Sequence, residues 1–238
     1  MNNGIELNAL LVDEIRRKAD EVRKFFGVFG DVPIANDIFM LLEKKEIILC
    51  EYPFEASEGS HTDATLTRFE TKGEPIVFIG LNTSLCYDEQ IFALAHELYH
   101  FITKTGKSYT DEDVEAPLTE KQADRFAAEL LLPWSTLHSL VVSEFKSECI
   151  DNSMYLRTLR FIARLQCEWW LPYHAIVNRL YEEKHIDQVF YEQLYEIDDR
   201  DSESVYSRIF RSFDLEKYML LNSRTRRKGV SSIAITYY

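Results

Sequence analysis

Two histidines separated by three residues, with a glutamate directly after the first, are the residues of this chain best placed for chemistry. They are His96, Glu97 and His100 in the segment IFALAHELYHFIT, which has the apolar spacing of a helix. Because an α-helix turns once in 3.6 residues, side chains four apart lie one above the other on one face. Two imidazoles held in this way can bind one metal ion, and a glutamate beside that ion can polarise a water molecule. The spacing therefore predicts a metal site of the hydrolytic kind.

A second predicted helix offers a further ligand. A catalytic zinc usually takes three protein ligands and leaves a fourth position for water. Downstream of the histidines, the apolar periodicity indicates a helix from a cap at Thr119 to a stop at Pro133. Glu120 and Asp124 stand one turn apart on it, so Glu120 could reach the metal while Asp124 accepts the N–H of a ligating histidine. This order, a glutamate helix after HExxH, is typical of a gluzincin site.

The segments HELYH and EKQADRFAAELLLP together resemble the ImmA/IrrE family of zinc metallopeptidases, which share a HExxH helix and a later ExxA(N/D)xFAxxLLxP helix. The resemblance covers roughly residues 30–187. It implies that His96, His100 and Glu120 bind Zn²⁺ and that Glu97 is the general base. It also implies a protein substrate: a helix-turn-helix transcriptional repressor, encoded nearby on mobile elements or in stress-response loci, whose cleavage derepresses the genes it controls.

Plainer interpretations of the same residues stay open. A histidine pair on an apolar helix is often structural, Glu120 could favour the positive end of a helix dipole, and Asp124 could be a solvated charge. If all three plain interpretations were true, each residue would have arrived at the spacing of a metal site independently of the others. The metal site is favoured because it explains all of the spacings at once. A further alternative is a regulatory or toxin–antitoxin-type protein that sequesters a partner without cutting it and holds a structural zinc. Structural zinc usually closes its fourth position, and the sequence offers no further cysteine or histidine near the motif.

The elements that must position these residues follow an α+β pattern, which favours a zincin-like catalytic domain with a small sheet. Residues 6–26 predict an amphipathic helix, and a second helix is expected from Val32-Pro33 to about Lys45. Three strands are predicted at 46–52, 64–70 and 75–81. The last of these directly precedes the HExxH helix, expected to begin at Asp88. It is the candidate to hold an extended substrate by backbone pairing, although its apolar content fits a central strand equally well.

The second half of the chain has a mostly helical pattern. We therefore divide the chain into a metallopeptidase domain, residues 1–133, and a helical domain, residues 134–238. Residues 155–187 indicate a helix, a short turn and a second helix, a helix-turn-helix-like segment. Acidic side chains offset the basic ones there, so direct DNA binding is not expected and a packing or protein-contact role is favoured. At the turn, Tyr173 or His174 could polarise the scissile carbonyl if the turn faces the zinc.

Composition narrows the class of protein. The net charge is −13, and residues 1–133 carry 25 acidic against 13 basic side chains, so the predicted catalytic half is acidic and suited to a basic partner. Four scattered cysteines without a C-x-x-C pair predict reduced thiols in a cytoplasmic protein. No run approaches eighteen consecutive apolar residues and the N-terminus lacks a signal-peptide pattern, so no membrane partner is expected.

Two stretches have weaker patterns. The polar stretch at residues 103–118, between the two predicted site helices, is interpreted as a lid or as a plain connection. The tail beyond Asp198 is less regular, with an acidic linker followed by a basic cluster. It ends in the alternating segment SSIAITYY, which predicts a terminal edge strand.

Overall fold

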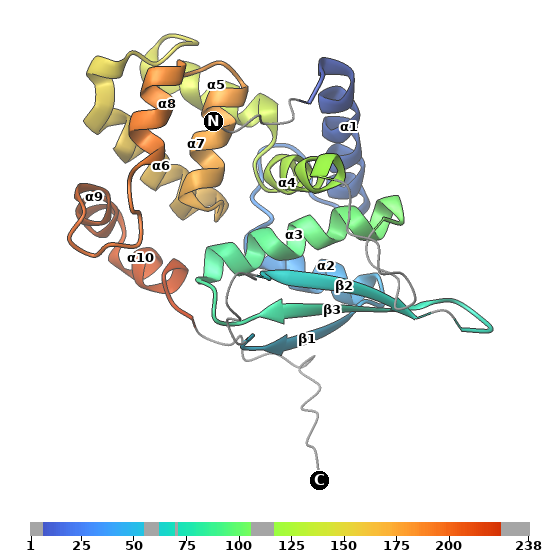
Figure 1. Ribbon diagram of the computed structural model, residues 1–238. Helices are drawn as coiled ribbons and strands as arrows, with labels where there is room; N and C mark the ends of the chain where they lie inside the picture. The colour runs from blue at the N-terminus through green and yellow to red at the C-terminus, as the bar shows by residue number, and fades with distance from the viewer. Residues whose placement is uncertain (1–6, 55–61, 70, 106–116, 225–238) are drawn as a thin grey trace.

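The fold is mixed α+β, which confirms the predicted class. The computed structural model describes residues 7–54, 62–69, 71–105 and 117–224. In chain order its elements are α1 (Ala9–Phe25), η1 (Ala35–Asp37), α2 (Ile38–Lys44), β1 (Ile48–Tyr52), β2 (Ala64–Phe69), β3 (Ile76–Asn82), α3 (Tyr87–Thr103), α4 (Pro117–Leu131), α5 (Trp134–Phe145), η2 (Asn152–Met154), α6 (Tyr155–Trp169), α7 (Tyr173–Glu182), α8 (Gln188–Tyr195), α9 (Val205–Phe213) and α10 (Leu215–Leu221). Figure 1 shows the sheet below α3, with α1 and α4 above α3 and α5 to α10 at the left.

The sheet has three strands in the order β1-β3-β2. Strand β3 is central: it pairs with β1 in parallel and with β2 in antiparallel register, and Ile79 lies opposite both Leu49 and Leu66. A central strand covered by helices favours a continuous apolar run, and the run IVFIGL in β3 fulfils this. Strands β1 and β2 therefore form the two edges of the described sheet.

Helix α3 lies between the sheet and α4 (Figure 1), and it contacts β2, β3, α2 and α4. Its apolar residues consequently occur around most of the helix, and Ile91, Leu94 and Leu98 are fully buried. At its N-terminus Cys86 is the cap residue, and the Glu89 carboxylate accepts a hydrogen bond from the Cys86 backbone N–H at 2.8 Å. This packing fixes the helix that carries HELYH.

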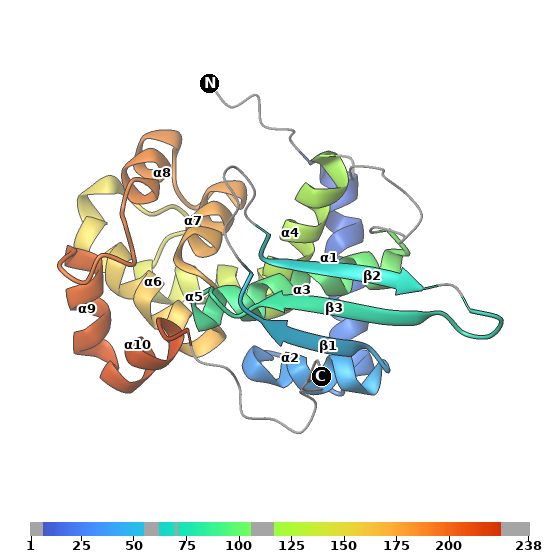
Figure 2. The ribbon, with the colours of Figure 1, turned by 60° about the horizontal axis from the view of Figure 1, so that its bottom comes forward.

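Helices α5 to α10 gather on one side of the unit formed by the sheet and α3 (Figure 2). Helices α6 and α7 are joined by a short turn at residues 170–172, as the helix-turn-helix-like pattern predicted. Helix α7 packs against α4, α6 and α8, and it buries Ile176, Val177 and Leu180. Burial of this helix favours a packing role over insertion into a DNA groove.

Some predicted boundaries need correction. Helix α4 begins at Pro117, two residues before the predicted cap at Thr119, because proline is well accommodated at the first position of a helix. Residues 32–34 are not helical, and a 3₁₀ turn precedes α2, which begins only at Ile38. Helices α8, α9 and α10 lie in the half of the chain predicted to be mostly helical, but the sequence did not predict them individually. They are short and end-capped: the Ser204 and Asp214 side chains accept hydrogen bonds from the first turns of α9 and α10.

A cluster of charged residues joins α4 to α1 and α7, and its members Arg125, Glu129 and Arg179 are buried. It consists of Arg16, Arg125, Glu129, Arg179, Glu182 and Glu183, and we call it the buried ion cluster. The Arg179 guanidinium lies 2.6 Å from the Glu129 carboxylate, and Arg16 lies 2.7 Å from Glu183. The cluster crosses the predicted boundary at residue 133, and the division into domains 1–133 and 134–238 stays a prediction.

Three further predictions can be compared with the described part of the chain. Cys50, Cys86, Cys149 and Cys167 are all unpaired, as expected. Among the described helices, none has the length and apolar character needed to cross a membrane. Most of the predicted lid (residues 106–116) and the predicted terminal strand (residues 231–238) lie outside the described residues.

Candidate metal centre

The three predicted metal ligands converge from two helices. His96 and His100 project from α3 and Glu120 from α4, and one ligand atom of each lies within 4.8 Å of the others. The Nε2 atoms of the two histidines are 3.1 Å apart, and Glu120 oxygens lie 3.3 Å from His96 Nε2 and 3.7 Å from His100 Nε2. Within the described ranges, no other group of three histidine, cysteine or acidic side chains is arranged to hold a metal.

These separations fit a zinc ion. Tetrahedral zinc with bonds of ~2.0–2.2 Å holds neighbouring ligand atoms ~3.3–3.5 Å apart, which is close to all three observed distances. Two imidazole nitrogens that point at each other also repel through their lone pairs unless a proton or a metal cation lies between them. The donor set, two imidazoles and one carboxylate, is that of a catalytic zinc site with one open position.

Asp124 accepts a hydrogen bond from the His96 ring nitrogen that points away from the other ligands, the contact that the sequence predicted. The His96 Nδ1–H donates to Asp124 Oδ1 at 2.8 Å, since an ionised carboxylate can only accept, and Nε2 is therefore the nitrogen that faces the other ligands. The Asp124 and Glu120 side chains are 61% and 44% exposed, whereas His100 is 3% exposed. The site is therefore buried on the α3 side and open to solvent on the α4 side.

Sequence reasoning missed two residues that hold His100. The Thr105 Oγ1 lies 3.0 Å from His100 Nδ1. Arg68, on β2, donates to the backbone carbonyls of His100 at 2.7 Å, Phe101 at 3.2 Å and Thr105 at 2.6 Å. A hydroxyl residue just past the helix was the only sequence signal for Thr105, and nothing local could connect Arg68 with a histidine 32 residues away.

Glu97 lies on α3 between the two histidines and is buried. Its carboxylate is close enough to His96 to help raise the pKa of that imidazole. A buried carboxylate beside a metal-binding pair has the position expected of a general base.

In the metal-free site the His96 imidazole is protonated near neutral pH. Burial opposes the charge on His96, but hydrogen bonds to Asp124 and Glu120 outweigh it and raise the pKa of His96 to about 10. Burial and the neighbouring charged His96 lower the pKa of His100 to about 4. Near neutral pH the pair therefore carries one proton more than two neutral imidazoles would, and this proton gives His96 its positive charge. A metal must displace this extra proton because a ligating histidine is neutral.

The predicted oxyanion residues, Tyr173 and His174, are not brought to this site by any described contact. Tyr173 is fully buried, and its hydroxyl donates to the Leu194 carbonyl at 2.9 Å. The His174 Nε2–H donates to the Tyr195 carbonyl at 3.2 Å. Both side chains bond to the end of α8, and the role predicted for them stays a prediction.

The strand predicted to bind substrate also needs correction. Residues 75–81 correspond to β3, whose two edges are both occupied by neighbouring strands, so it cannot pair with a peptide. Of the two edge strands, β2 contacts α3, which carries the histidines, whereas β1 contacts α2. Strand β2 is thus the edge nearer to the metal ligands in the fold.

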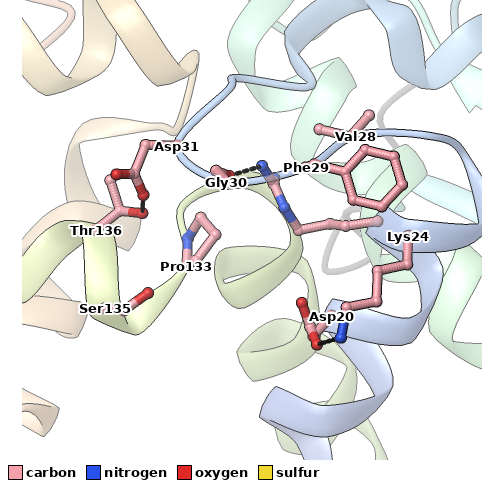
Figure 3. Close-up of a pocket in the computed structure, with 10 residues that line it drawn as sticks. Asp20, Lys24, Val28, Phe29, Gly30, Asp31, Pro133, Ser135 and Thr136 are labelled. Atoms are coloured by element: carbon pink, nitrogen blue, oxygen red, sulfur yellow. Dashed lines mark hydrogen bonds and ion pairs between the residues drawn. The ribbon is translucent and has the colours of Figure 1, made fainter.

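A shallow pocket of about 130 Å³ lies elsewhere, where the end of α1 and residues 28–31 meet the start of α5. Figure 3 shows Lys24 paired with Asp20 and Asp31 facing Thr136. The Arg23 guanidinium donates to three backbone carbonyls here, at Leu130, Gly30 and Val32. None of the predicted site residues lines this pocket, which we interpret as a packing junction.

Comparison with known proteins identifies a family. The sequence model of the IrrE N-terminal-like domain family (Peptidase_M78) matches residues 42–181, more than half of the chain, and this span includes His96, Glu97, His100 and Glu120. No curated protein and no solved structure matches the chain. The match confirms the resemblance predicted from the HELYH and EKQADRFAAELLLP segments. The chain belongs to the IrrE N-terminal-like family of metallopeptidases, Peptidase_M78.

Proposed function

We propose that this protein is a zinc-dependent endopeptidase in which His96, His100 and Glu120 hold the metal and Glu97 is the general base. The observation that carries the proposal is the convergence of the three ligand atoms within 4.8 Å, on the side of the histidines away from their outer partners. The Nε2 atoms of both imidazoles face this point, and the exposed side chain of Glu120 leaves the site accessible to a substrate.

The chain's own residues have distinct tasks in this reaction. When bound, zinc supplies Lewis-acid polarisation of the scissile carbonyl and makes a water molecule more acidic. The Glu97 carboxylate accepts the proton of the attacking water and then delivers it to the nitrogen of the leaving amine. Asp124 and Thr105 keep the two imidazole rings in the ligating orientation.

The substrate we propose is an extended, accessible protein segment that pairs with the outer edge of β2. This edge is open in the described sheet, and pairing through backbone hydrogen bonds is a common way to bind an extended peptide. From the family resemblance, we infer that the segment belongs to a helix-turn-helix repressor encoded nearby. The acidic balance of residues 1–133 suits a basic, DNA-binding partner. A cytoplasmic location agrees with the four unpaired cysteines.

The metal assignment is tested by metal analysis of the purified protein. We expect about one zinc per chain. His96→Ala or His100→Ala should lose the metal, and Glu120→Ala should weaken its binding. Zinc content that is unchanged in His100→Ala would rule out the proposed ligand set.

Catalysis is tested by incubating the protein with the repressor encoded beside it. Glu97→Gln keeps the size of the side chain but cannot take a proton, so it should bind zinc and repressor while cleaving ~10²–10⁴-fold more slowly. Glu21→Gln, the same change on an exposed turn of α1, is the matched control and should cleave at the wild-type rate. If Glu97→Gln inactivated the repressor as well as wild type does, with the repressor left full-length, the protein would act by sequestration.

A further inference from the structure

The end of α3 contains a chain of hydroxyl hydrogen bonds that starts at His100. The His100 Nδ1 lies 3.0 Å from Thr105 Oγ1, which lies 2.7 Å from Thr103 Oγ1. The Thr103 hydroxyl in turn donates to the Tyr99 carbonyl at 2.7 Å. Lys104, in the left-handed conformation with φ 56°, turns the backbone so that Thr105 returns to the histidine. We call Thr103 and Thr105 the threonine relay.

The direction of this relay follows from counting hydrogens. A carbonyl oxygen can only accept, so the single hydroxyl hydrogen of Thr103 is used on Tyr99. Thr103 can then only accept from Thr105, whose own hydrogen is used in that bond. Thr105 therefore accepts from His100, and the imidazole proton must be on Nδ1. This places the Nε2 lone pair of His100 on the side of His96 and Glu120.

We propose that the threonine relay sets the tautomer of His100 and thereby prepares its Nε2 to bind the metal; this inference rests on the proposed metal site. His96 obtains the same tautomer from the Asp124 carboxylate. The difference between the two histidines has a physical reason. Asp124 is largely exposed, whereas His100 is almost completely buried, and a further carboxylate there would have to be buried near Glu97 and Glu120. Neutral hydroxyls orient the ring without adding negative charge.

Arg68 fixes the two ends of the relay relative to each other. Its Nη2 donates to the carbonyl of His100 and its Nη1 to the carbonyl of Thr105. These bonds satisfy carbonyls near the end of α3, where a positive charge is also favoured by the helix dipole. Since Arg68 belongs to β2, it holds the histidine helix against the proposed substrate-binding strand. We assign Arg68, Thr103 and Thr105 as positioning residues, because each acts through His100.

The first test measures zinc affinity by competition with a chromogenic chelator. Thr105→Val keeps the shape but removes the hydroxyl, and we expect it to lower the affinity ~10–100-fold, as for other outer partners of ligating histidines. Thr105→Ser restores the hydroxyl and should restore the affinity. Thr158→Val is the matched control. On α6 the Thr158 hydroxyl donates to the carbonyl four residues back, at Met154, as the Thr103 hydroxyl does to Tyr99, so Thr158→Val can lose stability but should keep the wild-type affinity.

The second test reads the tautomer directly. Because a protonated His96 would itself donate to His100 Nε2 at 3.1 Å, the tautomer is read in metal-free His96→Ala protein at pH 8, where nitrogen-15 spectra of labelled histidine should show the His100 proton on Nδ1. Thr103→Val is the sharpest variant, because it leaves the atom that contacts His100 in place. Without an acceptor at residue 103, the Thr105 hydroxyl can donate to Nδ1, so the His100 proton should move to Nε2.

The two tests separate this inference from the proposed function. A protein that binds zinc but cleaves nothing would end the peptidase proposal and leave the relay standing, provided that the variants behave as expected. If the His100 tautomer in the metal-free His96→Ala protein were Nε2–H, the relay would be refuted whatever the activity. It would also be refuted if Thr105→Val and Thr103→Val kept both the wild-type tautomer and the wild-type affinity.

Discussion

Breaking the buried ion cluster at Arg179 should strongly destabilise the protein. The Arg179 and Glu129 side chains are 1% and 5% exposed and 2.6 Å apart. The cluster holds three arginines and three glutamates, so Arg179→Met leaves it with one uncompensated negative charge. Removing one partner of a buried pair costs ~3–5 kcal/mol. We expect a value near the lower limit, because the Glu129 carboxylate retains two partners in the variant. It still accepts a hydrogen bond from the Trp134 backbone N–H at 2.6 Å, and it still forms an ion pair with Arg125 at 3.6 Å.

The assay is equilibrium unfolding in urea, monitored by circular dichroism, with the slope of the transition compared between variants. Arg17→Met is the matched control. Arg17 pairs with Glu21 at 3.3 Å, but the two side chains are 66% and 60% exposed, and such surface pairs contribute ~0–1 kcal/mol. A domain of ordinary stability has a free energy of unfolding of ~5–15 kcal/mol, so the difference between the two variants is readily measured.

A double variant separates the loss of a charge from the loss of packing. Arg179→Met combined with Glu129→Met removes both charges from the pair, and replacing a buried ion pair by apolar groups is often close to neutral. The double variant should therefore be more stable than the sum of the two single changes predicts. Equal costs for Arg179→Met and Arg17→Met, or strict additivity in the double variant, would show that charge burial does not govern this cluster.

The remaining predictions concern the metal site. Asp124→Ala should lower zinc affinity ~10–100-fold by freeing the His96 ring, whereas Lys121→Ala, next to Glu120 on the same helix, should change it little in a chelator competition. Equal losses in the two variants would indicate a general disturbance of α4. Because the pKa of His96 is raised to about 10 in the metal-free site, its imidazole is protonated at pH 7 and a metal must expel that proton. Zinc affinity should thus rise with pH above 7, and about one proton should be released per zinc in calorimetric titrations with buffers of different ionisation enthalpy. Asp124→Ala should release fewer protons, and a wild-type protein that releases none would contradict the charge state assigned to His96.

Local features of the sequence were sufficient for much of the site. The spacing in HELYH places His96 and His100 on one helical face wherever that helix packs, since the relation between residues four apart is a property of the helix itself. The same holds for Glu120 and Asp124 on α4. Helix α3 begins one residue before the predicted Asp88, and each predicted strand agrees with the structure within two residues at either end, because periodic apolar patterns are read over short windows.

The tertiary structure decided which elements are neighbours. An apolar run such as β3 indicates a strand, but whether its edges are free depends on β1 and β2, which pair with it from other parts of the chain. Arg68 reaches the histidine helix only because β2 packs beside α3, and Tyr173 turns toward α8 rather than toward the metal ligands. The sequence by itself determined the types and local spacing of the ligands. The positions of their outer partners depend on contacts between residues tens of positions apart, which only the packing of the whole chain can set.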